Sequence, residues 1–238
     1  MPREPCAAWM REFGMRTDRR GRPRLVPSRR PGKSAKDEIL DAAAESFTTI
    51  GYAATSTRRI ADAVGIRQAS LYHHFATKDD ILDTLVTGTV EDSLQLAGEL
   101  LTEAGPSALR LHTLVVADAS QLIGSPWNVG ALYLLPEMRA ERFDAFRLRR
   151  DNLRTCYRTL SRAVIAECRG PSKSEDLPFR LVESVINQRS DDCGCPPDHP
   201  WIVAEGALRT LGFHDGFAQM RKLTAARLRR RGQSTAAC

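Results

Sequence analysis

Hydrophobic residues recur three and four positions apart from residue 34 onward, which is the spacing of amphipathic helices. The expected helices cover residues 34–50, 56–64, 68–74, 78–103, 107–123, 127–135, 137–168, 177–188 and 201–228. Glycine followed by proline separates several of them, as at Gly105-Pro106 and Gly170-Pro171. No segment alternates polar and apolar residues as a strand does, and no internal repeat is present. The pattern therefore predicts an all-α fold of about nine helices.

Three short helices follow one another at the start of this pattern. Ser34 is placed to cap the first helix, and Gly51 ends it. The second begins at Thr55 or Ser56 and ends at Gly65, and the third follows directly. Three helices within about 45 residues, with a glycine between the second and the third, are typical of a helix-turn-helix.

Between residues 36 and 82 many residues stand at fixed spacings: Ile39-Leu40-Asp41-Ala42-Ala43, Phe47, Gly51-Tyr52, Thr55-Ser56, Ile60-Ala61, Gly65, Leu71-Tyr72-His73-His74-Phe75 and Lys78-Asp79-Asp80-Ile81-Leu82. In this register the chain resembles the DNA-binding domain of TetR-type transcriptional repressors. The resemblance implies a DNA-binding domain over residues 34–82 and a larger helical domain over residues 83–228 that binds an effector and dimerises. A basic arm (1–33), which we expect to be disordered, and a basic tail (229–238) flank these domains.

The third helix begins with short or polar residues, as a recognition helix must in order to reach base edges in the major groove. Gln68 can pair with adenine through two hydrogen bonds, Ala69 can meet a thymine methyl group, and Ser70 can reach either base. The resemblance implies that Tyr72 and His73, one turn further on, contact backbone phosphates.

Helix N-termini attract phosphate because their N–H groups are free and the helix dipole is positive there. Thr55, Ser56 and Arg58 stand at the start of the second helix and Lys78 at the start of the fourth, so we expect all four near the DNA backbone. Arg67 stands where the family commonly caps the third helix with Ser or Thr. Either this cap is weak or Arg67 itself contacts DNA.

The net charge of +6 lies in the two ends of the chain. Residues 1–33 contain ten basic and three acidic residues, and residues 220–238 contain six basic and no acidic residues. We expect basic arms that seek phosphate, or that only aid solubility, around an acidic body. The segment 19–24 resembles an AT-hook core, so Arg22 and Arg24 are candidates for the minor groove, with non-specific phosphate contact as the alternative.

The resemblance implies a homodimer through the last two long helices, 177–188 and 201–228, and a small-molecule effector among the middle helices. A dimer places two recognition helices about 34 Å apart, which predicts a pseudo-palindromic operator. Aromatic and polar side chains suit an effector pocket, although each of them could instead pack in the core. The candidate lining residues are His112, Trp127, Tyr133, Met138, Phe143 and Phe146.

Several functional classes lack support in the sequence. It has no glycine-rich phosphate loop, nucleophile elbow or spaced metal-ligand set, so we expect neither an enzyme nor a cofactor. Without a membrane span or a secretory signal, we expect a cytoplasmic protein. Cys193, Cys195 and His199 share a loop that is either structural or a metal or redox sensor; the spacing is too weak to assign a metal.

These features together predict a sequence-specific DNA-binding transcriptional regulator. The resemblance favours a repressor that a small molecule releases from a pseudo-palindromic operator in double-stranded DNA. Two alternatives stay open: a constitutive architectural DNA-binding protein that uses the AT-hook-like arm, and a regulator that responds to a metal or to thiol oxidation.

Overall fold

The computed structural model describes residues 30–32, 34–192 and 194–236. These residues form nine α-helices and three short 3-10 helices and contain no strand, so the all-α prediction is confirmed. None of the described helices is both long and apolar enough to cross a membrane. The elements are α1 (Ala35–Thr49), α2 (Thr57–Val64), α3 (Gln68–Tyr72), α4 (Lys78–Thr102), α5 (Ser107–Gly124), η2 (Val129–Leu134), η3 (Pro136–Arg139), η4 (Glu141–Phe143), α6 (Asp144–Cys168), α7 (Leu177–Asp191), α8 (His199–Thr210) and α9 (Phe217–Ala236).

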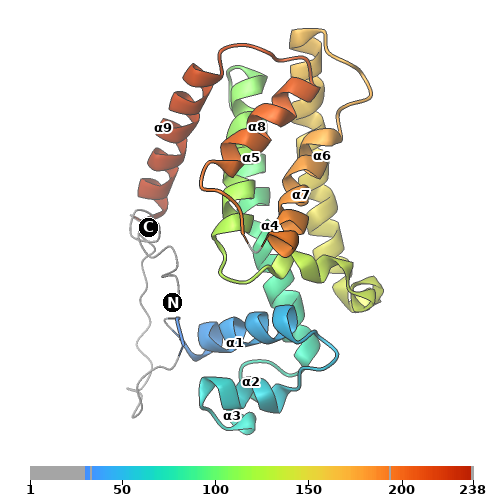
Figure 1. Cartoon of the computed structure of the whole chain (residues 1–238), viewed down its shortest axis with the longest axis vertical. Helices are drawn as coiled ribbons and strands as arrows, with labels where there is room; N and C mark the ends of the chain where they lie inside the picture. Colours follow the sequence, from blue (N-terminus) through green and yellow to red (C-terminus); the bar gives the residue numbers. More distant parts are fainter. Residues whose placement is uncertain (1–29, 33, 193, 237–238) are drawn as a thin grey trace.

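Helices α1, α2 and α3 form a small unit at one end of the molecule (Figure 1). Their apolar faces meet around Ile39, Ile60 and Leu71, all fully buried, and Phe47 closes the same core. Gly65 ends α2 with φ 76°, a left-handed conformation that glycine adopts without strain. The sharp turn it permits sends α3 across α2, and this is the helix-turn-helix that the sequence predicts.

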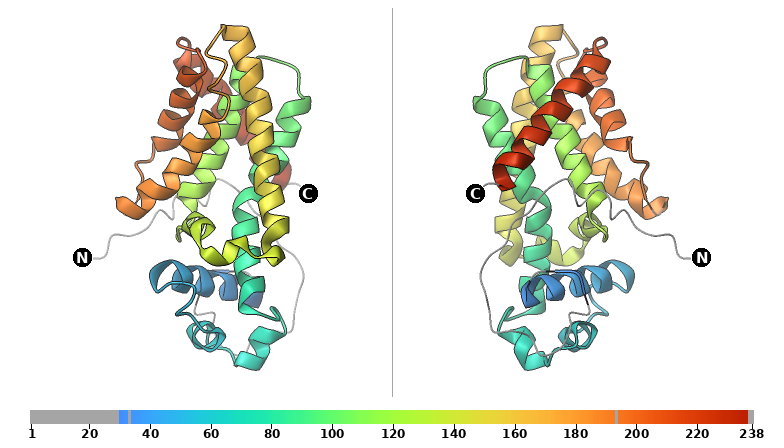
Figure 2. Two further views of the ribbon diagram at one scale, coloured as in Figure 1. Left: turned by 90° about the vertical axis from the view of Figure 1, so that its right-hand side faces the viewer. Right: turned by 90° about the vertical axis from the view of Figure 1, so that its left-hand side faces the viewer.

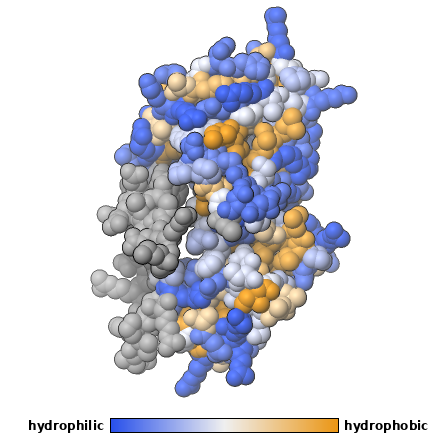
Figure 3. All heavy atoms as spheres, viewed as in Figure 1, coloured by the Kyte–Doolittle hydropathy of each residue, from blue (hydrophilic) through white to orange (hydrophobic). Residues whose placement is uncertain are grey.

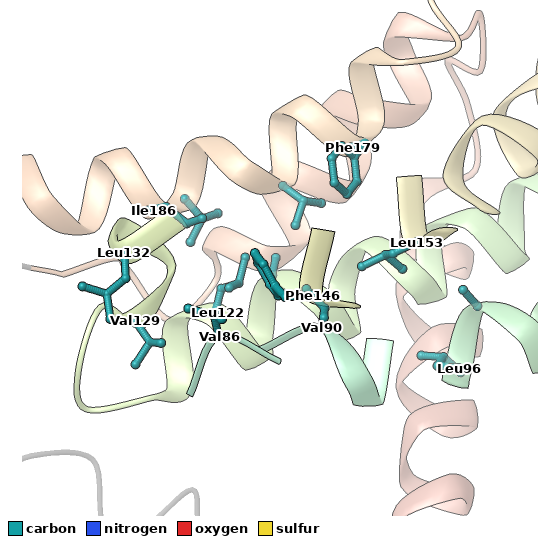
Figure 4. Packing of buried hydrophobic residues seen from close by; sticks show 14 of the residues in the cluster. Val86, Val90, Leu96, Leu122, Val129, Leu132, Phe146, Leu153, Phe179 and Ile186 are labelled. Atoms are coloured by element: carbon teal, nitrogen blue, oxygen red, sulfur yellow. The ribbon is translucent and has the colours of Figure 1, made fainter. Parts of the chain in front are cut away.

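The body of the molecule is a helical bundle built around α5. This helix packs against α4, α6, α7, α8 and α9, and its residues Leu111, Leu114 and Val115 are fully buried. Apolar side chains from α4, α5, α6 and α7, among them Val90, Leu122, Leu153 and Phe179, converge in the interior (Figure 4). Helix α4 belongs to both parts, because its first turns contact α1 and its later turns line the bundle.

Two long helices expected from the sequence are broken in the structure. Residues 137–143 form η3 and η4, and α6 begins only at Asp144. The single helix expected over residues 201–228 is two helices, because Gly212 and Gly216 have φ of 90° and 77° and turn the chain between α8 and α9. Helix α9 then packs on a side of α5 away from α7 (Figure 2).

The basic C-terminal segment is helical as far as Ala236, and acidic residues of the body neutralise part of its charge. Arg221 Nε lies 2.5 Å from Glu205 Oε1, and Arg231 Nε lies 3.1 Å from Glu99 Oε2. Arg227 pairs with Glu103, the residue that follows the last turn of α4. Three of the six basic residues of segment 220–238 are thus paired within the protein, and the attraction of this segment to phosphate stays a prediction.

His112 and Asp118 are ionisable side chains buried in the bundle. His112 Nδ1 lies 2.8 Å from Thr224 Oγ1 on α9, while its Nε2 has no hydrogen-bond partner, and burial lowers the pKa of His112 to about 4. Asp118 accepts hydrogen bonds from the hydroxyls of Tyr157 at 2.8 Å and Ser93 at 2.9 Å. Burial nevertheless raises the pKa of Asp118 to about 6. At neutral pH the bundle thus holds a neutral imidazole and an ionised carboxylate.

The two groups have opposite effects on stability as the pH falls. Neutral His112 stabilises the fold fully above pH 6.5, and this stabilisation is lost as the pH falls towards 4. Ionised Asp118 costs stability above pH 6, and the cost is relieved as the pH falls towards 3.8. We expect Asp118→Asn to lose about 2 kcal/mol more unfolding free energy than the wild type between about pH 6.5 and about pH 4.5. Urea denaturation across this range measures the difference.

His112→Gln is the matched variant, because glutamine can keep a hydrogen bond to Thr224 without a proton to gain. Its stability should rise on acidification relative to the wild type, since only the relief at Asp118 remains. Equal pH slopes for the wild type and both variants would contradict the assignment of opposed titrations.

Candidate nucleic-acid interface

Helix α3 lies at one end of the molecule (Figure 1). Leu71 is fully buried beneath the helix, so the helix cannot rotate without exposing it. Gln68 and Ala69 are exposed, and Ser70 is half-buried beside them. Tyr72 is 47% exposed at the end of the helix. The structure therefore gathers the expected base-reading residues on one accessible face, with His73 exposed next to them.

The side chain of Gln68 is tied to its neighbours by hydrogen bonds. Its Nε2 donates to Thr57 Oγ1 at 3.0 Å and to Tyr72 Oη at 3.3 Å. The two hydroxyl oxygens are themselves 3.1 Å apart. The sequence gives no sign of this role for Thr57, because nothing in the spacing of α2 and α3 reveals that its hydroxyl faces the first residue of α3.

The start of α2 and the start of α3 differ in their capping. Ser56 Oγ accepts a hydrogen bond from the backbone N–H of Arg59 at 3.2 Å, so α2 is capped. Arg67 occupies the capping position of α3 and makes no side-chain hydrogen bond there. Ser56, Arg58 and Arg67 are all exposed, as a contact with the DNA backbone requires. As expected, the Arg67 side chain does not cap α3, and its guanidinium is accessible.

Two of the predicted contact residues have structural roles. Thr55 is 2% exposed, and its hydroxyl donates to the carbonyl oxygen of Gly51 at 2.8 Å. The prediction that the Thr55 side chain contacts DNA is therefore wrong in this structure. Lys78 Nζ donates to the carbonyl oxygens of Tyr52 at 2.8 Å and Thr55 at 3.0 Å, and lies 4.1 Å from the centre of the Tyr52 ring. Lys78 is half-buried and keeps one N–H donor, so its contact with the DNA backbone stays a prediction.

The same lysine fastens α4 to the helix-turn-helix. Tyr52 donates its hydroxyl hydrogen bond to Asp79 in the first turn of α4, next to the bonds made by Lys78. From the other side, Arg142 of η4 pairs with Asp79 and with Asp80, the latter at 2.9 Å. The first turn of α4 is therefore held by both domains. We call these five interactions, the two bonds of Lys78, the Tyr52–Asp79 bond and the two pairs of Arg142, the α4 clasp.

A second link joins the two domains further along α1. Trp127, just before η2, donates its indole N–H to Asp41 Oδ1 of α1 at 2.8 Å. Asp41 Oδ2 accepts from Arg30 at 2.9 Å, and Arg30 also pairs with Glu45. The expected arm boundary at residue 33 is therefore too late, because Arg30 already packs on α1. Arg22 and Arg24 lie outside the described residues.

The interior of the bundle contains a small cavity of about 20 Å³ between α4, α5, α6 and α7. This is room for about one water molecule. Its lining combines six apolar side chains with five polar ones. The polar residues around it are Thr89, Asp118, Tyr133, Arg150 and Glu183. Arg150 pairs with Glu183, and the Tyr133 and Thr89 hydroxyls are hydrogen-bonded to each other.

Of the six residues predicted to line an effector pocket, only Tyr133 borders this cavity. Phe146 stacks on the Tyr133 ring, with centroids 5.1 Å apart. His112 is fully buried against α9, and Trp127 links the domains instead. Met138 and Phe143 are 4% and 1% exposed within the core. His112, Trp127, Met138, Phe143 and Phe146 do not border this cavity, so their part in an effector pocket stays a prediction. Helical spacing alone does not distinguish packing positions from pocket positions.

Helices α7 and α8, which lie side by side, bury most of their apolar residues within the protomer. The buried set is Phe179, Val182, Val185, Ile186, Ala204, Leu208 and Leu211. On the outer face Leu177 is 44% and Ile202 is 49% exposed, and a Cβ at Gly206 would meet nothing within 4 Å. On the face that carries α7 and α8, exposed hydrophobic residues lie among hydrophilic ones (Figure 3). The outer face of α7 and α8 therefore exposes fewer apolar residues than the sequence predicts.

The cysteine loop offers no metal site among the described residues. No group of three His, Cys, Asp or Glu side chains within them could hold a metal ion. Cys195 is a free, half-buried thiol whose pKa is raised by burial, which keeps it protonated. Cys193 lies outside the described residues.

Known proteins match the N-terminal part of the chain. Residues 39–85 match the family described as bacterial regulatory proteins, tetR family. The HTH-type transcriptional repressor KstR2 of Rhodococcus jostii is 40% identical over 88 residues, which make up 37% of this chain and 43% of that protein. KstR2 of Mycobacterium tuberculosis is 45% identical over 85 residues, 36% of this chain and 42% of that protein. The chain thus matches less than half the length of these curated relatives.

Solved structures extend the similarity to the helical body. The crystal structure of Mycobacterium smegmatis AmtR is 65% identical with a TM-score of 0.83, over 85% of this chain and 98% of that chain. The structure of the ketosteroid transcriptional regulator KstR2 of Mycobacterium tuberculosis shares the fold at 24% identity and a TM-score of 0.62, over 76% of this chain and 95% of that chain. With its helix-turn-helix matched to the family and its length matched to a close relative, the chain belongs to the TetR family of bacterial regulatory proteins.

Proposed function

We propose that this protein is a sequence-specific DNA-binding repressor. The observation that carries the proposal is the exposed polar face of α3, where Gln68 and Ala69 stand over a fully buried Leu71. This helix is rigidly seated and small enough at its start to enter a major groove. The N-terminal similarity to KstR2, a transcriptional repressor, supports repression.

The proposal includes a basic arm that supplies much of the affinity. The part of the DNA-binding unit that reads bases is not strongly basic, since residues 34–80 contain five basic and seven acidic residues. Arg30 anchors the last residues of the arm on α1 through Asp41 and Glu45. The arm therefore leaves the protein beside the helix-turn-helix, within reach of the phosphates and the minor groove next to the operator half-site.

The proposed active form is a homodimer through the outer face of α7 and α8. Leu177 and Ile202 are large apolar residues exposed on neighbouring helices, and a second copy of the same face would remove both from water. Gly206 lies one turn after Ile202 with open space above it, which lets two helices approach closely. Two-fold symmetry then spaces the two α3 helices for a pseudo-palindromic operator.

Release from DNA is proposed to follow binding of a small polar molecule in the bundle. The cavity holds about one water, so a ligand must push α4 away from α6 and α7 to enter. Because the α4 clasp ties the first turn of α4 to Tyr52, a shift of α4 carries α3 with it. A differential affinity of about 1–3 kcal/mol gives roughly 5- to 150-fold weaker operator binding.

Selection of bound duplexes from a random pool tests DNA binding and the arm. The wild type should select two inverted half-sites whose centres are about one helical turn apart. A chain that begins at Arg30 should keep the same site but bind it several-fold more weakly, with a shallower dependence of log affinity on log salt concentration, because fewer counterions are released. An unchanged salt slope would remove the arm from the mechanism, and selection of no sequence would overturn the proposal.

The dimer face is tested by Ile202→Glu, which would bury two like charges at the centre of the interface. Sedimentation velocity at micromolar concentration should show a dimer for the wild type and a monomer for the variant. Leu148→Glu on α6 is the control, because Leu148 is 63% exposed and lies outside this face. A variant at Ile202 that stays dimeric would place the interface elsewhere.

The effector site is tested by a screen for molecules that release the wild type from its selected operator. Asp118→Asn and Tyr133→Phe remove a charge and a hydroxyl from the cavity lining with little change in volume. Each should raise the concentration needed for half-release by about tenfold, one hydrogen bond to a charged or polar group being worth about 1.5 kcal/mol. Unaltered release in both variants would show that the molecule binds at another site.

A further inference from the structure

The exposed side chain of Gln68 is held by two hydroxyl groups, one from α2 and one from the end of α3. Thr57, from α2, and Tyr72, the last residue of α3, both lie within hydrogen-bond distance of its Nε2. An unrestrained glutamine has three rotatable bonds, and ordering them on binding costs free energy. The surrounding hydroxyls remove much of that freedom before any DNA is present.

The three distances show how the amide is used. Nε2, Thr57 Oγ1 and Tyr72 Oη form a nearly equilateral triangle with sides of 3.0, 3.1 and 3.3 Å. The two oxygens therefore subtend about 60° at the nitrogen, whereas the two N–H bonds of an amide diverge by about 120°. A single N–H that points between the two oxygens can serve both hydroxyls, and this leaves the second N–H and the carbonyl oxygen Oε1 available to a base.

The contact between the hydroxyls favours this orientation of the amide over the reverse one. With the nitrogen inward, one hydroxyl can donate to the other, and all three short distances are hydrogen bonds. With Oε1 inward, both hydroxyls would have to donate to it, and the 3.1 Å contact between Thr57 and Tyr72 would have no proton. The amide thus turns Oε1 and one N–H outward, and these are the acceptor and the donor that adenine N6 and N7 require in the major groove.

We propose that Thr57 and Tyr72 are positioning residues for base reading, and that their hydroxyls hold the Gln68 amide for bidentate recognition of adenine. The inference rests on the proposed DNA-binding function and goes beyond it, because it assigns specificity to a residue of α2. A hydroxyl that only touched a phosphate would change affinity for every sequence by the same factor. A positioning hydroxyl changes the ratio between the right base and a wrong one.

The experiment uses the full chain and the operator that it selects. The Gln68→Ala variant first identifies the half-site position at which adenine preference disappears. Affinities are then measured for the selected duplex and for one in which that A·T pair is replaced by G·C, with wild type, Thr57→Val, Thr57→Ser and Tyr72→Phe. The wild type should discriminate by at least about 5-fold, the lower end for a bidentate contact. Thr57→Val and Tyr72→Phe should reduce this ratio towards that of Gln68→Ala, while Thr57→Ser, which keeps the hydroxyl, should preserve it.

Valine matches threonine in shape, so thermal denaturation serves to verify that Thr57→Val is folded, and Tyr72→Phe carries the test if it is not. An undiminished discrimination ratio in the folded variants would overturn the inference, even if both bind every duplex more weakly. A Gln68→Ala protein with unchanged preference at every position would overturn it as well, because Gln68 would then read no base. Failure of the wild type to select any duplex is a separate result, and it overturns the proposed function on which the inference rests.

Discussion

The attachment of the helix-turn-helix to the first turn of α4 is the constraint on which the rest of the molecule depends. Lys78 donates hydrogen bonds to the carbonyl oxygens of Tyr52 and Thr55, and the Tyr52 hydroxyl donates to Asp79. From the body, Arg142 forms an ion pair with Asp79 in the same turn. Lys78 is a hydrogen-bond partner for the carbonyl oxygen of Thr55 and a second partner for that of Tyr52, so breaking these bonds costs stability. The consequence is mechanical: α4 cannot move in the bundle without moving the unit that carries α3. The Trp127–Asp41 bond adds a second point of attachment on α1.

The basic residues at the two ends of the chain differ in how many of them pair with carboxylates, and the net charge of the whole chain does not show this difference. The arm contains ten basic residues before position 34, whereas segment 220–238 contains six and pairs Arg221, Arg227 and Arg231 with carboxylates of the body. Charges that are paired within the protein release fewer counterions from DNA than free ones do. We therefore expect the N-terminal end to supply more of the long-range attraction to DNA, while these three C-terminal arginines hold α9 against the bundle.

The polar interior is the part of the body that packing alone does not explain. A buried carboxylate with two hydroxyl donors, an ion pair and a hydroxyl pair surround space for one water molecule. Burying such groups costs free energy unless each has a partner, and here most of the partners are other groups of the same cluster. A cluster that satisfies itself can exchange partners with a polar ligand at little net cost, which is the property an effector site needs.

The local features of this protein were predictable from its sequence, and the long-range ones were not. Helical spacing and caps such as Ser34 and Gly65 determined the all-α class, the helix-turn-helix and the face of α3 that carries Gln68, because these depend on residues within one or two turns. Helical spacing did not predict the break at Gly212. It also did not predict the burial of His112 and Thr55, because spacing cannot distinguish a core position from a pocket position or a DNA contact. Thr57 stayed hidden for the same reason: its partner is eleven residues away in the chain and meets it only because α3 folds back across α2. Only the tertiary structure decides which polar groups from different helices lie close enough to form hydrogen bonds, because these groups are far apart in the sequence.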